Sequence, residues 1–151
     1  MAVVCTLSNH FKYQKNAKQI DLSNGSPPGD TFKIILMDDT FAFDKDAHAT
    51  LADVIASPSH ELPTGYGYTQ QNKALSGGTL TEDDTNDKAI RTFENVTWTA
   101  DGGSIGPTGA AVIYDDTTTD KTVVGCIDFG TDYTIPSGSS LQLQNIAIQD
   151  A

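Results

Sequence analysis

The sequence predicts a mainly β fold, which we expect to be an antiparallel β-sandwich or jelly-roll-like domain with an N-terminal helix and one short helical insertion. Thr, Ser, Gly and Asn are abundant in the 151 residues, whereas charged residues make up only 19%, and this mixture favours strands and turns. About eight short apolar or alternating segments are separated by turn signals, as in β-sandwiches. No Pro-rich or Gly/Ser-rich linker divides the chain, so residues 1–151 are expected to form a single domain.

An N-terminal helical arm is expected within residues 1–22, packed on the core or on a partner. In residues 8–20, SNHFKYQKNAKQI, Ser8 is a suitable helix cap. Phe11 and Ile20 fall near one face of that helix, and lysines occupy the others. Because the apolar stripe is thin, the helix is expected to lie against a larger body.

The next segments predict a turn, a strand and the short helix. Residues 23–29, SNGSPPG, predict a turn because Asn-Gly supplies positive φ and Pro-Pro prevents a helix. Residues 32–37, FKIILM, predict a strand inside a sheet, since only Lys33 interrupts the apolar run. Residues 44–56 predict the short helical insertion, with Asp46 as its cap.

From Thr79 onward the chain alternates between strands and turns. In the best strand pattern, Trp98 alternates with polar neighbours, which predicts that its ring points into the core. Residues 115–120 predict a polar hairpin tip. The strands of this half are expected at residues 79–82, 89–93, 96–100, 110–114, 122–129 and 141–148.

The last of these strands contains a break in its alternation. Leu141 and Leu143 share one face, whereas Ile146 and Ile148 have the opposite parity. One extra residue in a strand shifts the alternation by one position. The sequence therefore predicts a bulge near residues 144–145 that returns all four side chains to one side.

The loop Gly65-Tyr66-Gly67-Tyr68 carries two tyrosines between glycines. Tyr66 and Tyr68 are expected either to pin the loop to the core or to contact a partner, since exposed tyrosine is favoured at interfaces.

Composition argues against several classes of partner and location. The net charge is −11 with nine basic residues, and nucleic-acid binding needs clustered Lys and Arg. The same charge disfavours an anionic bilayer, and neither a signal peptide nor a membrane-spanning apolar run is recognised. Cys5 and Cys126 are expected to be free thiols, made in a reducing cytoplasm.

One string resembles a catalytic motif. Gly102-Gly103-Ser104-Ile105-Gly106 matches the G-x-S-x-G elbow of serine hydrolases, which needs a strand before it and a helix after it. Here a β pattern follows, and all three histidines precede Ser104, whereas the catalytic histidine of that family comes last. We interpret the string as a glycine-rich connection and expect no catalytic residues.

Acidic clusters raise the alternative of a cation site. Residues 82–87, EDDTND, are the best candidate for calcium, which binds several carboxylate oxygens, but they lack the calcium-loop spacing and are better explained by solvated turns. Asp44 to His48 lacks a second His or Cys at zinc-ligand spacing. We therefore expect no metal and no cofactor.

Eight strings carry a family resemblance: FKYQ (11–14), DTFKIILM (30–37), FAFDKDAHAT (41–50), GYGYT (65–69), EDDTND (82–87), NVTWTADGGSIGP (95–107), AVIYDD (111–116) and VVGCIDFG (123–130). In these strings the chain resembles a small virion structural protein of tailed bacteriophages. The resemblance covers almost the entire length in the same order and includes no catalytic motif.

The resemblance implies a non-enzymatic component of a phage particle, made in the host cytoplasm and located in the virion. The favoured role is a capsid decoration or cement protein on the outside of the head. Its partners would be the major capsid protein or other virion proteins, and a homo-oligomer, with a trimer favoured, is expected. Neither nucleic acid nor membrane is an expected partner.

The expected partner contacts lie on the N-terminal helix and the tyrosine loop, at Phe11, Lys12, Lys15, Lys18, Tyr66 and Tyr68. Within the same class, a tail, neck or head-fibre component is the alternative. A more remote one is a carbohydrate-binding β-sandwich module, with Tyr66, Tyr68 and Trp98 as stacking platforms.

Overall fold

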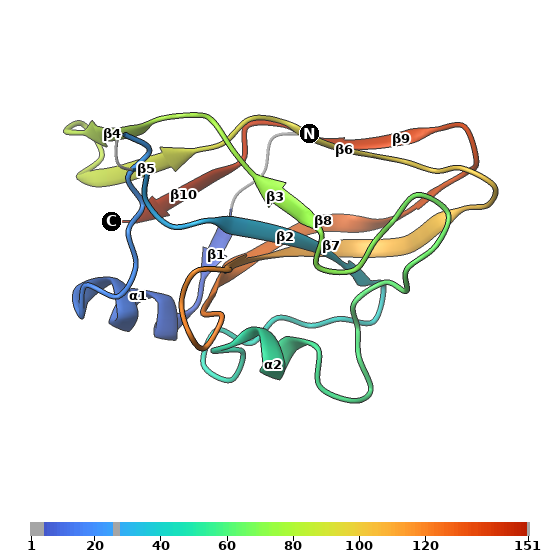
Figure 1. Cartoon of the computed structure of the whole chain (residues 1–151), viewed down its shortest axis with the longest axis horizontal. Coiled ribbons are helices and arrows are strands. Elements are labelled where there is room, and N and C mark those ends of the chain that lie inside the picture. Colours follow the sequence, from blue (N-terminus) through green and yellow to red (C-terminus); the bar gives the residue numbers. More distant parts are fainter. Residues whose placement is uncertain (1–4, 26–27, 151) are drawn as a thin grey trace.

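The computed structural model describes residues 5–25 and 28–150, and Figure 1 shows a body built almost wholly from strands. All pairs of strands in these ranges are antiparallel, so the prediction of a mainly β, antiparallel fold with two helices is confirmed. The described elements are β1 (Cys5–Leu7), α1 (Asn9–Asn16), β2 (Phe32–Asp38), α2 (Leu51–Val54), β3 (Lys73–Leu75), β4 (Leu80–Asp83), β5 (Lys88–Thr92), β6 (Val96–Thr99), β7 (Ile105–Asp115), β8 (Val123–Ile135), β9 (Ser140–Leu143) and β10 (Ala147–Asp150).

The largest sheet has the strand order β1-β8-β7-β2-β3. Its β2 lies between β7 and β3, which confirms the prediction that the apolar run at residues 32–37 is an interior strand. The long strands β7 and β8 form a hairpin that runs through the middle of this sheet (Figure 1). We call residues 116–122, which connect them, the tip.

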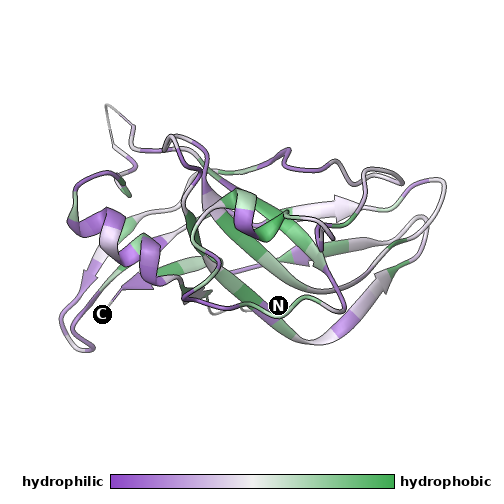
Figure 2. Ribbon diagram, turned by 90° about the horizontal axis from the view of Figure 1, so that it is seen from below, coloured by the Kyte–Doolittle hydropathy of each residue, from purple (hydrophilic) through white to green (hydrophobic). Residues whose placement is uncertain are grey.

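The two faces of the large sheet bury different clusters of side chains. On one face, Ile34 and Leu36 of β2 pack with Trp98 and with residues of β9 and β10. On the other face, Ile35 and Met37 pack beneath α2, and Figure 2 shows α2 lying across the apolar strands. Each such buried aliphatic side chain contributes about 1.5–3 kcal/mol of transfer free energy. The continuous apolar run of β2 is therefore explained by burial on both faces.

Beyond the first cluster lie two smaller sheets, one of order β10-β5-β4 and one in which β6 pairs with β9. The predicted break at residues 144–145 falls between them, because β9 ends at Leu143 and β10 begins at Ala147. Asn145 has a φ of +56°. Leu141, Leu143, Ile146 and Ile148 all join one core cluster. The shared burial of these four side chains was predicted correctly. It results from a change of strand partner between β9 and β10 rather than from a bulge inside one strand.

The N-terminal helix is shorter than predicted. Ser8 is its N-cap, as expected, and α1 then ends at Asn16 instead of reaching Ile20. Lys18 has a φ of +59°, a left-handed conformation that ends helices. Ile20 is nevertheless buried in the same cluster as Phe11, so this segment packs on the core of its own chain.

The second helix also differs from its prediction, and Asp46 is not its cap. The carboxylate of Asp44 accepts the backbone N–H of Asp46 and of Ala47, and this turn replaces the first half of the expected helix. The helix α2 begins only after Thr50, where Thr50 and Asp53 form a capping box.

The strands β1 and β3 have three residues each, too few for a periodic pattern to reveal, and sequence reasoning missed them. In contrast, β7 extends far beyond the predicted 110–114, because its first half contains Gly106, Pro107 and Gly109, which resemble turn signals. None of the helices in the described residues is long and apolar enough to cross a membrane.

Candidate partner-binding surfaces

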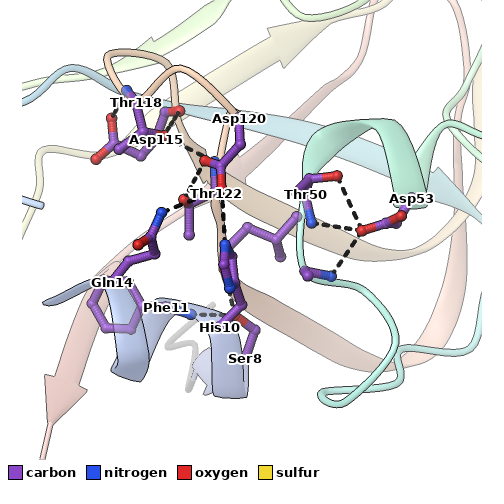
Figure 3. Close-up of polar contacts among 12 residues, drawn as sticks. Ser8, His10, Phe11, Gln14, Thr50, Asp53, Asp115, Thr118, Asp120 and Thr122 are labelled. Atoms are coloured by element: carbon purple, nitrogen blue, oxygen red, sulfur yellow. Dashed lines mark hydrogen bonds and ion pairs between the residues drawn. The ribbon is translucent and has the colours of Figure 1, made fainter. Parts of the chain in front are cut away.

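The helix α1 is fastened to the large sheet at its first turn (Figure 3). The hydroxyl of Ser8 accepts the N–H of Phe11 at 3.0 Å and donates to the carbonyl oxygen of Val123 at 2.5 Å. Phe11 is 0% exposed. The apolar side of α1 therefore already has its counterpart within the chain.

The tip holds α1 a second time. The carboxylate of Asp120 lies 2.8 Å from His10 Nε2 and accepts the side-chain amide of Gln14 at 3.3 Å. Its other oxygen accepts the hydroxyl of Thr122 at 2.6 Å. Burial acts to raise the pKa of Asp120, but the hydrogen bonds from Thr122 and His10 outweigh it and hold the pKa below its usual value.

These contacts decide which of the expected partner residues on α1 face outward. Phe11 is turned into the core, and Lys15 forms an ion pair with Asp150. Lys12 and Lys18 are exposed. Tyr13, which sequence reasoning overlooked, is 66% exposed. Its position two residues after the buried Phe11 places it on the opposite side of the helix, and that spacing is the signal that could have found it.

The two tyrosines of the glycine loop have opposite roles. The hydroxyl of Tyr68, which is 2% exposed, donates to Glu61 Oε1 at 3.0 Å and accepts the N–H of Leu36 at 3.0 Å. Tyr66 is 58% exposed. Tyr68 therefore pins the loop to the core, as the first interpretation expected, whereas the contact of the exposed Tyr66 with a partner stays a prediction.

The ring of Tyr66 lies against Gly103, where an added Cβ would come within 2.4 Å of it. This contact explains why a glycine occupies position 103 of the string at 102–106, since any side chain there would clash with the ring. As predicted, the chain continues from that string as a strand and not as a helix, because β7 begins at Ile105 within the string.

Ser104 has no histidine beside it in the described residues, because each histidine is engaged elsewhere. His10 contacts Asp120, and the Nδ1 of His48 accepts the N–H of Asp44. His60 lies 3.2 Å from the carboxylate of Asp38. No Ser–His pair forms in this part of the chain.

A groove of about 600 Å³ lies on the large sheet, over Ala110 of β7 and Cys126 of β8. Four carboxylates and two phenylalanines line it, namely Asp38, Asp39, Asp128, Asp132, Phe41 and Phe43. Asp132 lies directly over Gly109, where a Cβ would approach its Oδ1 to 2.6 Å. Burial opposes ionisation of Asp38, but hydrogen bonds from Thr40 and His60 hold its pKa below the usual range. The groove is therefore negatively charged at neutral pH.

No metal centre is formed by the residues that the structure describes, among which no three His, Cys, Asp or Glu side chains are grouped as ligands. In the 82–87 segment, the carboxylate of Asp83 instead accepts the N–H groups of Thr85 and Asn86 and the side-chain amide of Asn86. This turn satisfies the local carboxylate without a cation.

The two cysteines are free and buried. Thr6, not Cys5, lies opposite Cys126 in the pairing of β1 with β8. Because successive side chains of a strand point to opposite faces, the two sulfurs lie in the two different core clusters. This geometry does not allow a disulfide between them within one chain.

Of the three aromatic residues considered as sugar-stacking platforms, Tyr68 and Trp98 are buried and only Tyr66 is exposed. The ring of Trp98 also lies beneath the Lys73 ammonium, 5.6 Å from its centre.

Comparisons of the chain with protein-family models, with curated proteins and with solved structures found no match.

Proposed function

We propose that this chain is a non-enzymatic structural protein of a tailed-bacteriophage virion, most specifically a decoration or cement protein on the outside of the capsid. The observation that carries the proposal is the resemblance to such proteins, which extends through almost the whole sequence in one order. It includes the strand strings at 30–37 and 111–116 as well as the loop string at 65–69.

We further propose that the strand layers form a β-sandwich of the jelly-roll-like kind. The large sheet would be one layer, and β4, β5, β6, β9 and β10 would together be the other. The shared core between Ile34, Leu36, Trp98 and Leu143 supports this arrangement. A rigid body of this type suits a protein that must present fixed surfaces to a lattice.

The proposed contact with the capsid is the outward side of α1, through Lys12 and Tyr13, together with Lys18 just beyond the end of the helix. These side chains form a basic and aromatic surface on a protein whose net charge is −11, so an acidic surface of the shell is the complementary partner. Because α1 is already fastened to the sheet, binding orders little additional chain. The exposed ring of Tyr66 is the second proposed contact.

Binding to the assembled shell would stabilise it by mass action, because the protein would bind the lattice and not its free subunits. A homotrimer would place three copies of the α1 surface around a local threefold position of the lattice.

Deletion of residues 1–20 is a poor test of this surface, since it also removes Leu7, Phe11 and Ile20 from the core. The sharper test is the double charge reversal Lys12→Glu/Lys18→Glu. Virions grown without the native gene are supplied with the variant, and its copies per particle are counted by mass spectrometry. We expect a loss of about tenfold or more.

The matched control is Lys73→Glu/Lys88→Glu, which changes the net charge equally on β3 and β5. It is expected to be incorporated like the native protein, once melting curves show that both variants fold. Equal incorporation of the two variants would contradict the role of α1.

A tail, neck or head-fibre component is the alternative within the same class. Cryo-electron microscopy of the virion separates the two, because a decoration protein gives density across the head lattice and the alternative gives density at the tail, neck or one vertex.

A further inference from the structure

A buried carboxylate at the end of β7 has one oxygen without a hydrogen-bond donor. Asp115 is 0% exposed. Its Oδ1 accepts the N–H of Thr117 at 2.8 Å and that of Thr118 at 3.2 Å, but its Oδ2 has no donor among the described residues. An ionised carboxylate that is removed from water and left half-satisfied is strongly disfavoured. A proton or another cation at Oδ2 would remove this penalty.

The acidic neighbour of Asp115 is Asp30, which adds to burial in raising the pKa of Asp115, and the residues that follow these two in the chain are hydrogen-bonded, Asp116 N–H to the carbonyl oxygen of Thr31. Asp30 is held in place by Asp21, whose N–H donates to Asp30 Oδ2 at 2.9 Å and whose carbonyl oxygen accepts the Asp30 N–H at 2.9 Å. Two carboxyl groups in contact satisfy each other only when one of them carries a proton.

Close to Asp115, residues 28–31 are hydrogen-bonded to the tip. The N–H of Thr31 donates to the hydroxyl of Thr117 at 2.8 Å, and the N–H of Asp116 donates to the carbonyl oxygen of Thr31 at 2.8 Å. The Asp30–Asp115 contact therefore lies inside a small set of bonds that fastens one segment to another.

The charged groups around this contact are engaged with each other. On β2 and the tip, Lys33 and Lys121 both bind the carboxylate of Asp116, at 3.2 Å and 2.8 Å. On the side of α1, His10 contacts Asp120. The described ion pairs thus leave Asp30 and Asp115 without a cation, and the nearby lysines disfavour a bound metal ion.

We propose that Asp115 and Asp30 share one proton, and that this proton makes their contact a pH-sensitive clasp between residues 28–31 and the end of β7, where the tip begins. In the closed form, the protonated Oδ2 of Asp115 donates to the carboxylate of Asp30. When the proton leaves for solvent, two adjacent carboxylates repel each other and the clasp opens.

The protonation equilibrium agrees with this geometry. Burial, and then the neighbouring Asp30, raises the pKa of Asp115 from 3.8 to about 7. Between these two values the folded protein binds a proton that the unfolded chain does not, so stability decreases as the pH rises through this window. Because the tip also holds α1 through Asp120, opening the clasp is expected to loosen that helix.

The test is the melting temperature at about pH 6 and about pH 8.5, where the native protein is expected to lose about 5 °C at the higher value. In Asp115→Asn the amide keeps an acceptor for Thr117 and Thr118 and donates an N–H to Asp30 at every pH. That variant should melt at nearly the same temperature at both values.

The matched control is Asp84→Asn, which removes one negative charge at an exposed position and should keep the native pH dependence. A native melting temperature that does not fall, or an Asp115→Asn variant that falls as much as the control, would overturn the proposal. A rise in the native melting temperature on adding Ca²⁺ at the higher pH, absent in Asp115→Asn, would also overturn it in favour of a metal ion.

A second measurement needs no variant. The carbon-13 carboxyl resonance of Asp115 in the native protein should titrate with a midpoint near 7, together with the amide resonances of Thr31 and Thr117. A midpoint in the ordinary range of aspartate would refute the shared proton.

Discussion

The hydroxyl of Ser8 and the carbonyl oxygen of Val123 are joined by a 2.5 Å hydrogen bond across 115 positions of sequence. The same hydroxyl caps α1, so one small side chain both begins a helix and fastens it to β8. We predict that Ser8→Ala lowers the free energy of unfolding by about 2 kcal/mol, since it removes a cap and leaves a buried carbonyl unpaired. Chemical denaturation measures this loss. Ser139→Ala, at an exposed position, should change stability by less than about 0.5 kcal/mol.

Tyr68→Phe is predicted to destabilise the fold by about 1–3 kcal/mol, because Glu61 loses a donor and the N–H of Leu36 loses an acceptor inside the core. The companion variant Tyr66→Phe, at the exposed position, should be neutral in the same denaturation experiment. Burial and the nearby Glu61 also raise the pKa of Tyr68 above that of an ordinary tyrosine. Tyr68 should therefore not ionise in the folded protein. In an alkaline absorbance titration of folded samples, the native protein and Tyr68→Phe should show the same number of tyrosinates.

Substitutions at two glycines distinguish the cost of an unfavourable backbone conformation from the cost of a steric clash. Gly67 and Gly102 both have positive φ, +95° and +74°, but a Cβ on Gly67 would lie 2.1 Å from the carbonyl oxygen of Thr99, whereas one on Gly102 meets nothing within 4 Å. Gly102→Ala should cost about 1 kcal/mol. Gly67→Ala should cost clearly more, about 3 kcal/mol, since the backbone must also move. Equal denaturation midpoints for the two variants would contradict this assignment.

The two thiols are predicted to be reduced and unreactive in the folded protein. Burial raises the pKa of Cys5 to about 12 and also raises that of Cys126, so neither forms the reactive thiolate at neutral pH. A chromogenic thiol reagent should label both cysteines only in denaturant. Non-reducing electrophoresis should show no intramolecular crosslink, and rapid labelling of the native protein would be incompatible with this packing.

The contact between His10 and Asp120 gives a pH dependence opposite to that of Asp115. Because the pKa of Asp120 is lowered in the folded state, the unfolded chain binds a proton more readily, so this stabilisation is present at neutral pH and is lost as the pH falls through the folded pKa. Asp120→Asn should therefore melt below the native protein at about pH 7, and the difference should shrink below about pH 4. A difference that is constant with pH would exclude this linkage.

Features that depend on nearby residues were predictable from the sequence. The Ser8 cap, the interior position of β2, the burial of Trp98 and the break at residues 144–145 all follow from local pattern and parity. The cap of α2 did not, because Asp46 and Thr50 are both good capping residues. The choice between them depends on the bridge from Thr50 to Thr122 of the distant tip.

The candidate surfaces were predictable only in part, for a related reason. A thin apolar stripe on a helix shows that the helix must be covered, but not whether its own chain or a partner covers it. Phe11 is covered from within, whereas Lys12 and Lys18 remain outside. The contact of Asp30 with Asp115 carries no local signal at all, since neither residue has an unusual neighbour in sequence.

The pairing of β1 with β8 has a consequence for biosynthesis. Cys5–Leu7 leaves the ribosome early, but its partner strand in the sheet includes Gly125–Ile127. At typical rates of translation, the first strand waits on the order of 10 s before its partner exists. Docking of the N-terminal strand and of the helix behind it therefore has to wait until residues 125–127 have been synthesised, and a nascent chain stalled before the tip should expose Phe11 to chaperones.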